Sequence, residues 1–143
     1  MRLTTYSDYC LRLLMYAATK PDRVTIQGAA DAYGISKNHL MKVAFDLGRL
    51  GYLDTVRGRG GGVRLARPPE EIRLGELLRR TEEDFRIVEC FNAGTNRCVI
   101  SHACRLKGIL GEATAAWLAV MDRYSLADLT GQNPALARQL LSA

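Results

Sequence analysis

Apolar residues recur every three or four positions in the N-terminal part of the chain, which is the period of helices with one buried face. This spacing predicts a helix over 7–20, in which Cys10 shares the apolar stripe and is expected to be a small buried residue. A second helix is predicted between Thr25 and Gly34, and a third behind Ser36, which is a good N-cap. Two short helices joined by a glycine-containing turn indicate a helix-turn-helix.

After the third helix the pattern changes to the alternation that is typical of short β-strands. Two such runs, 52–56 and 62–66, flank a loop of arginine and glycine at 57–61. They predict a β-hairpin wing, which completes a winged helix-turn-helix. A short amphipathic helix is then predicted over 74–81, with three leucines facing inward.

A longer helical pattern runs from 104 to 124. Its apolar positions are spaced four and three apart over nearly three heptads, which is typical of a helix that pairs with another helix. The seam consists of Leu106, Leu110, Ala113, Trp117, Val120 and Tyr124, widened by Ile109, Ala116 and Met121. A capping box at 125–128 predicts a last short helix, and Pro134 is expected to break the remaining tail.

These elements predict a mainly α-helical fold with one small β-hairpin, in which a winged helix-turn-helix is followed by a long dimerisation helix. We expect a DNA-binding winged helix-turn-helix over 1–67 and a linker helix with a cysteine cluster loop over 68–104. The dimerisation helix and a C-terminal tail occupy 105–143. A chain of 143 residues is long enough for one core but short for two domains. One long terminal helix on a winged-helix protein of this size predicts a homodimer. The alternative is that its broad apolar stripe packs against the chain's own domain.

Positive charge is concentrated at the N-terminal end. Residues 1–67 contain 11 Lys and Arg against 5 Asp and Glu, whereas residues 68–143 contain 9 against 10, so the first region supplies the excess behind the net charge of +5. A one-sided basic balance fits a polyanion such as double-stranded DNA. No export signal or membrane-length apolar run is visible, which predicts a cytoplasmic protein with no membrane partner.

The start of the predicted third helix carries side chains suited to the major groove of DNA. Lysine can reach guanine or phosphate there, asparagine can pair with adenine, and wing arginines can contact phosphates or enter the minor groove. The predicted DNA-binding residues are Ser36, Lys37, Asn38, His39 and Lys42 on the helix and Arg57, Arg59 and Arg64 on the wing. A homodimer would present two such helices to a pseudo-palindromic operator. The alternative is a solvated basic face on a winged helix that binds protein.

Three of the four cysteines lie in one short stretch, Cys90, Cys98 and Cys104, separated by seven and then five residues. Thiolates are the ligands that iron–sulfur clusters and zinc select, so this grouping predicts a metal centre. Structural zinc sites usually space paired ligands two to four residues apart, a pattern that these three cysteines lack among themselves. Candidates for a fourth ligand are His102, Asp8, Glu89 and a small molecule. Unmetallated thiols, or a redox switch between Cys98 and Cys104, are the metal-free alternatives.

The sequence does not predict an enzyme. Cys98 and His102 are four residues apart and would form a nucleophile–base pair on a helix, but no orienting carboxylate or cofactor loop accompanies them. The glycine-rich stretch 58–62 leads into a strand and lacks the Gly-Lys-Ser/Thr sequence that holds phosphates.

Several motifs resemble the Rrf family of bacterial winged-helix transcriptional regulators. They are 1–4 (Met-Arg-Leu-Thr), 6–9 (Tyr-Ser-Asp-Tyr) and the wing sequence 57–62 (Arg-Gly-Arg-Gly-Gly-Gly). The cysteine-containing stretch 88–107 and the segment 119–129 are similar to the nitric-oxide-sensing NsrR branch of this family. The resemblance covers residues 1–130. Two departures are the seven-residue first cysteine spacing and Val99, which stands where proline is frequent.

This resemblance implies a homodimeric repressor that senses nitric oxide with one iron–sulfur cluster per subunit, of the 4Fe–4S type. Cys90, Cys98 and Cys104 match the family's three ligands. Asp8 matches a position that, in some members, donates a carboxylate from the partner subunit. The residues alone also allow Asp8 to be a first-turn carboxylate paired with Arg12.

Two alternatives stay open within the family. A 2Fe–2S cluster is the alternative cofactor, although Lys107 stands where histidine-ligated relatives place their histidine. The alternative function is a regulator of iron–sulfur or redox status that uses a different cluster or metal-free thiol switching.

Overall fold

The predicted helix-turn-helix is present, with one helix in front of it. The structure is a computed structural model and describes residues 2–56, 58–131 and 133–142. The three helices are α1 (Thr5–Ala17), α2 (Ile26–Tyr33) and α3 (Lys37–Arg49). Helix α1 begins earlier than predicted, because the Thr4 side chain accepts a hydrogen bond from the Ser7 amide and caps the helix.

Local capping explains the turn between α2 and α3. Thr25 caps α2 by accepting a hydrogen bond from the Gly28 amide. Gly34 ends α2 with a φ of 63°, a left-handed conformation that favours glycine. Ser36 occupies the N-cap position of α3 as predicted, although within the described part of the chain its side chain forms no capping hydrogen bond.

The wing is a two-stranded antiparallel hairpin, as the alternating pattern predicts. Strand β1 (Leu53–Val56) pairs with β2 (Gly62–Leu65). Val24 forms an additional bridge to Val63 in β2. A side chain at Gly62 would collide with the carbonyl oxygen of Val24, so this close approach of two backbone segments requires glycine.

The hydrophobic core lies between the three helices and the hairpin. Cys10 is fully buried in it, which confirms the prediction for this residue. Leu77 and Leu126, which follow the wing in the chain, belong to the same core. The C-terminal part of the chain therefore packs directly on the winged helix. The largest fully buried side chains are Tyr52, Leu13, Leu14, Leu40, Leu47, Ile72, Leu77, Leu78 and Leu126.

Two helices flank the cysteine-containing stretch and are joined by an ion pair. They are α4 (Leu74–Thr81), which the sequence predicts, and α5 (Arg105–Asp122). Arg79 donates hydrogen bonds of 2.5 and 2.8 Å to the two carboxylate oxygens of Asp122. A side chain at Gly75 would collide with this carboxylate, so the glycine lets the end of α5 approach α4.

The broad apolar stripe predicted on α5 divides into two faces. Leu110 and Trp117 are half-buried, and the Trp117 ring lies 5.9 Å from that of Phe85. The other face stays exposed, including Leu106 at 58%, Ile109 at 53% and Val120 at 41%. This exposed apolar face consists of Leu106, Ile109, Ala113, Ala116 and Val120, again spaced three and four apart. The predicted pairing of this face with a second helix stays a prediction.

The chain ends in two helices, which corrects one prediction. Helix α6 (Leu126–Thr130) opens with the predicted capping box. Pro134, predicted from the sequence to break the tail, instead begins helix α7 (Pro134–Leu141). Proline suits the first turn of a helix because the N–H that it lacks would have no intrahelical partner there. Asn133 caps the helix, and Leu140 is buried in the core.

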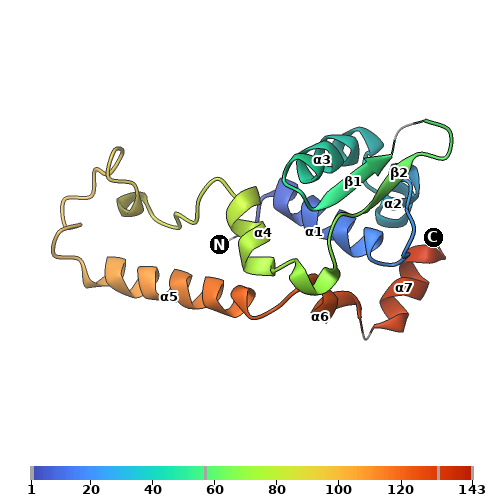
Figure 1. Ribbon diagram of the computed structural model, residues 1–143. Helices are drawn as coiled ribbons and strands as arrows, with labels where there is room; N and C mark the ends of the chain where they lie inside the picture. The colour runs from blue at the N-terminus through green and yellow to red at the C-terminus, as the bar shows by residue number, and fades with distance from the viewer. Residues whose placement is uncertain (1, 57, 132, 143) are drawn as a thin grey trace.

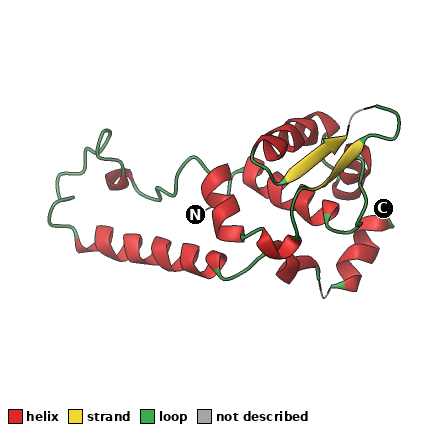
Figure 2. Cartoon of the chain, viewed as in Figure 1, coloured by secondary structure: helices red, strands yellow, loops and turns green. Residues whose placement is uncertain are grey.

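Figures 1 and 2 show an elongated molecule with the winged helix at one end. Helix α5 begins at an irregular loop at the opposite end of the molecule and runs from there back toward the winged helix (Figure 1). Two short 3₁₀ helices, η1 (Pro69–Glu71) and η2 (Glu89–Phe91), lie before and after α4. Within the described residues, no helix combines the length and apolar character needed to cross a membrane.

Candidate DNA interface and cysteine segment

Helix α3 buries one stripe and exposes the side chains predicted to bind DNA. Leu40, Val43, Ala44 and Leu47 face the core. The exposed residues at its start are Ser36, Lys37, Asn38, His39 and Lys42. The His39 ring lies 6.4 Å from that of Tyr9, so His39 stands beside α1. The predicted residues thus share the solvent side of α3, as major-groove contact requires.

The wing places its predicted arginines in different surroundings. Arg59 is exposed in the loop of the hairpin. Arg64 is paired with Asp54 of the opposite strand at 3.1 Å. Arg57 lies outside the described residues. Arg59 is therefore available to a polyanion, whereas Arg64 would have to share or exchange its carboxylate partner to contact a phosphate.

Three residues near this surface are not among those predicted from the sequence. Arg23 lies beside Gly60 of the wing loop, close enough to contact a side chain placed there. Phe45 and Arg49 are exposed on α3. Counting from Asn38 with the helical period would have found them, because they follow it by two and three turns. No local pattern marks Arg23, since a tertiary contact brings it to the wing.

The cysteine segment (residues 89–104) leads from η2 to the start of α5. Cys90 lies in η2, Cys98 in the loop that follows, and Cys104 at the N-cap position of α5. All three thiols are free and partly exposed. They therefore have the access to solvent that a ligand-binding or reactive thiol needs.

Hydrogen bonds organise the middle of the cysteine segment. The Asn96 side chain accepts from the Cys98 amide at 3.0 Å and donates to the Ser101 hydroxyl at 2.9 Å. Ser101 is buried. The Glu89 carboxylate accepts from the Arg97 amide at 2.5 Å. Glu89, one of the candidate fourth ligands, is thus engaged within the segment itself.

The donor set of the cysteine segment suits an iron–sulfur cluster by its chemistry. Three free thiols, placed on a short 3₁₀ helix, in a loop and at the N-cap of α5, are soft ligands of the kind that such clusters use. They are not gathered in advance, since no three His, Cys, Asp or Glu side chains among the described residues are placed to hold a metal ion. Binding a cluster would therefore require the segment to close around it.

Cys10 is chemically separate from the other three cysteines. It is fully buried in the core. Burial raises the pKa of its thiol to about 12, so the thiol stays protonated near neutral pH. Because the thiolate is the form that binds metals, Cys10 is unsuited to be a ligand.

The other candidate ligands lie in two places. Asp8 is on α1 and bonds to Arg12 of the same helix at 3.0 Å, as one interpretation of the sequence expected. The Asp8 side chain is 43% exposed, so it is accessible from solvent. His102 is exposed within the cysteine segment. The ligand role of Asp8 stays a prediction.

The start of α1 is bonded to the end of α4, close before the cysteine segment. The Ser7 hydroxyl donates to the Thr81 hydroxyl at 2.8 Å, and both residues are buried. The Thr4 amide and hydroxyl both donate to the Glu82 carboxylate, at 2.8 and 3.0 Å. We call these four residues the α1–α4 joint. It connects the helix in front of the helix-turn-helix to the chain that leads into the cysteines.

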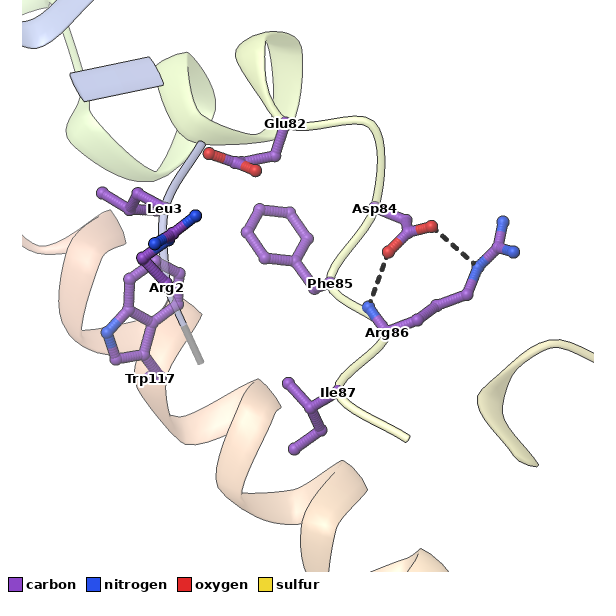
Figure 3. Close-up of a pocket in the computed structure, with 8 residues that line it drawn as sticks. All are labelled: Arg2, Leu3, Glu82, Asp84, Phe85, Arg86, Ile87 and Trp117. Atoms are coloured by element: carbon purple, nitrogen blue, oxygen red, sulfur yellow. Dashed lines mark hydrogen bonds and ion pairs between the residues drawn. The ribbon is translucent and has the colours of Figure 1, made fainter. Parts of the chain in front are cut away.

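A cavity of about 260 Å³ lies next to this joint (Figure 3). Its walls come from the N-terminal residues, the stretch after α4, and α5. They are Arg2, Leu3, Glu82, Asp84, Phe85, Arg86, Ile87 and Trp117. At the rim, the Arg86 amide and guanidinium donate to Asp84 at 2.8 and 3.2 Å. Trp117 is the only tryptophan of the chain, so its fluorescence reports on this contact.

The sequence of this chain matches a known protein family. Residues 3–132 match the Rrf2 family, described as an iron-dependent transcriptional regulator. The chain belongs to the Rrf2 family. This match confirms the resemblance seen in the sequence motifs. The chain is therefore a transcriptional regulator of a DNA-binding family and not an enzyme.

Two curated relatives are similar over nearly the whole chain. The HTH-type transcriptional regulator NsrR of Bacillus subtilis is 56% identical over 131 residues, which cover 90% of each chain. That of Bacillus licheniformis is 51% identical over 144 residues, covering 99% of this chain and 100% of the relative. These similarities support the NsrR branch of the Rrf2 family.

A solved structure confirms the predicted fold class. The global cysteine regulator CymR of Bacillus subtilis superposes with a TM-score of 0.72, over 92% of this chain and 97% of that protein. Its sequence identity is 20%, so this likeness concerns the fold alone. This chain is thus a winged-helix protein that is mainly helical and has one β-hairpin.

Proposed function

We propose that this Rrf2-family chain is a homodimeric repressor that binds a pseudo-palindromic operator and senses nitric oxide through an iron–sulfur cluster. The observation that carries this proposal is the cysteine segment, whose three free and partly exposed thiols precede α5. Regulators named NsrR, 51% and 56% identical to the chain, support it. The proposed ligands are Cys90, Cys98 and Cys104, with Asp8 of the partner subunit as the fourth. We propose the 4Fe–4S type, which the resemblance to the NsrR branch implies.

The winged helix supplies the proposed DNA contacts. The excess of positive charge lies in residues 1–67, which fold into α1 to α3 and the wing. On α3 the side chains of Lys37, Asn38 and Lys42 are exposed opposite the core. We assign base and phosphate contacts to the start of α3 and phosphate contacts to the wing arginines.

The exposed apolar face of α5 supplies the proposed dimer contact. Its large side chains are accessible in one chain, and their spacing of three and four suits a helix pair. A twofold axis through this contact would place two α3 helices on successive half-sites of one DNA face. The proposed regions are thus DNA binding over 1–67, cysteine segment and linker over 68–104, and dimerisation over 105–143.

A path of contacts leads from the end of α4, after which the chain continues into the cysteine segment, to α3. When bound, a cluster would supply iron that reacts with nitric oxide. In the chain itself, the α1–α4 joint bonds the stretch before Cys90 to α1. The Tyr6 hydroxyl of α1 then donates to Asp46 of α3 at 3.2 Å. If one conformation of the cysteine segment favours one placement of α3, cluster binding and DNA binding are coupled thermodynamically.

Anaerobic spectroscopy combined with DNA binding tests this function. The protein is purified without oxygen, and its visible spectrum is recorded while nitric oxide is added in the presence of an operator selected from random duplexes. We expect a brown protein that bleaches and releases DNA together. Cys98→Ser should lose the colour, whereas Cys10→Ala, which removes a buried thiol, should keep it.

A colourless protein after anaerobic reconstitution would overturn the cluster. The three cysteines of the segment would then be assigned to zinc binding or thiol switching, and metal analysis with thiol counting would distinguish these two. Unchanged nitric-oxide response in Asp8→Ala would remove Asp8 from the proposed ligands and leave the cysteines in place.

A further inference from the structure

One stripe of α3 faces directly away from the core and carries a large apolar side chain in its middle. Counting in helical turns from Asn38, this stripe continues through Lys42, Phe45 and Arg49. The buried stripe, which includes Leu40 and Leu47, lies on the opposite side. Phe45 is 60% exposed, although an aromatic side chain of this size is normally buried. The core therefore does not explain why phenylalanine stands here.

The neighbours of Phe45 indicate what covers it. Lys42 precedes it by one turn and Arg49 follows it by one turn, so cations stand on both sides of the ring. The Arg49 guanidinium lies 6.0 Å from the ring centroid, which is within cation–π range. An apolar ring between two cations suits a polyanion with an apolar group at its centre, and the major groove of DNA offers this combination. Phosphates line the groove, and the thymine C5-methyl group projects into it.

We propose that Phe45 is a specificity residue that packs on a thymine methyl group in each operator half-site. This inference rests on the proposed operator binding through α3 and adds the base that α3 prefers. In this assignment Lys42 and Arg49 hold the flanking phosphates, and the ring of Phe45 selects thymine over cytosine, which lacks the methyl group. Met41, which is 53% exposed one turn before Phe45, widens the apolar surface.

The test removes the methyl group from the DNA and the ring from the protein. Full-length protein, purified without oxygen, selects an operator from random duplexes. Each thymine of that operator is then replaced by deoxyuridine, which lacks only the C5-methyl group, in symmetric pairs. Dissociation constants are measured at one salt concentration for the unmodified protein and for Phe45→Ala. The substitution removes an exposed side chain, so the fold should be retained.

We expect one symmetric pair of deoxyuridines to weaken binding of the unmodified protein about fifteenfold, or roughly fourfold for each methyl group. Phe45→Ala should bind the thymine operator about as weakly as the unmodified protein binds the deoxyuridine operator. In Phe45→Ala the same deoxyuridines should then change the affinity less than about twofold, because the variant has already lost the contact between the ring and the methyl group. Phe45→Leu, which keeps an apolar surface but cannot form the cation–π contact, should retain most of the thymine preference.

Two control variants separate this assignment from other effects. Lys42→Ala should weaken binding to the thymine and deoxyuridine operators by the same factor and should reduce the salt dependence. Leu141→Ala removes another exposed apolar side chain, on α7, and should leave both affinities unchanged.

The outcomes distinguish the inference from the proposed function. If the unmodified protein enriches an operator but the deoxyuridine effects are equal in the presence and absence of the Phe45 ring, the thymine contact is wrong and operator binding stands. If the unmodified protein enriches no sequence, the proposed operator binding fails and the inference fails with it.

Discussion

The Ser7 hydroxyl donates a hydrogen bond of 2.8 Å to the Thr81 hydroxyl, and this contact joins α1 to α4 in a buried position. Thr81→Val should lower the free energy of unfolding by roughly 1–3 kcal/mol, because the Ser7 hydroxyl loses its acceptor in a place without water. Ser7→Ala should have a similar cost. The double variant should lose less than the sum of the two, which chemical denaturation measures. Strict additivity would contradict the contact.

The same contact should carry part of the coupling between the cysteine segment and DNA. In the double variant Ser7→Ala/Thr81→Val we expect the ratio of operator affinities before and after nitric oxide to fall by about an order of magnitude, because substitutions along a coupled network change the coupling free energy by roughly 0.5–2 kcal/mol. Thr114→Val is the matched control, because among the described residues its hydroxyl bonds only to the Leu110 carbonyl of its own helix. An unchanged ratio would show that the coupling does not depend on the contact between Ser7 and Thr81.

Gly75 is expected to control how α5 docks on α4. In Gly75→Ala the new methyl group collides with the Asp122 carboxylate and should displace it from Arg79. The contact between Trp117 and Phe85 should loosen, so tryptophan emission should shift to longer wavelength and the melting temperature should fall. Gly108→Ala should raise helix stability by about 0.5–1 kcal/mol without shifting emission, because among the described residues its new methyl group meets nothing within 4 Å beyond the adjacent backbone of its own helix. Equal emission from both variants would contradict the docking role.

Local patterns predicted most of the helices and the wing, because caps, apolar periods and turn residues act within a few positions. Gly34 and the capping box at 125–128 are examples. The same reasoning misread Pro134, since proline both ends one helix and begins another, and the choice depends on the burial of Leu140 six residues later. Periodicity also could not decide which half of the α5 stripe packs on the chain itself.

The site was less predictable because its contacts join distant positions. Thr4 and Glu82 are 78 residues apart, and only the packing of α4 on α1 brings them together. Arg23 reaches the wing by the bridge between Val24 and Val63. The exposed residues of α3 were predictable in kind, because the helical period fixes their face. The cysteines were predictable as a group, but their spacing does not specify how the segment folds around a ligand.

Cys10 should make the fold sensitive to alkaline pH. Burial raises the pKa of its thiol from 9.0 to about 12, so the unfolded chain loses this proton before the folded chain does. The stability is fully present below about pH 9 and falls as the pH rises toward 12, by at most about 1.4 kcal/mol per pH unit. Cys10→Ala should flatten this decline in urea unfolding measured on both sides of about pH 9.

Tyr33 adds to the same decline, which provides a control. Burial raises the pKa of its hydroxyl to about 12 as well. Within the described residues this buried hydroxyl has no hydrogen-bond partner, so Tyr33→Phe should raise stability at neutral pH by about 1 kcal/mol and remove the second alkaline contribution. If the decline is identical in both variants and the unmodified protein, its cause lies in other groups.

The exposed apolar face of α5 should determine whether the chain dimerises. Ile109→Glu or Val120→Glu should raise the dimer dissociation constant by at least about 100-fold. A twofold contact would bury two new carboxylates, one from each subunit, without a partner. Sedimentation velocity over a concentration series measures this change. Val99→Glu is the matched control, since Val99 is 94% exposed but lies in the cysteine segment, outside α5. Operator affinity should fall when dimerisation is lost, because each separate subunit contacts only one half-site. A chain that stays dimeric in both α5 variants would place its twofold axis on another surface.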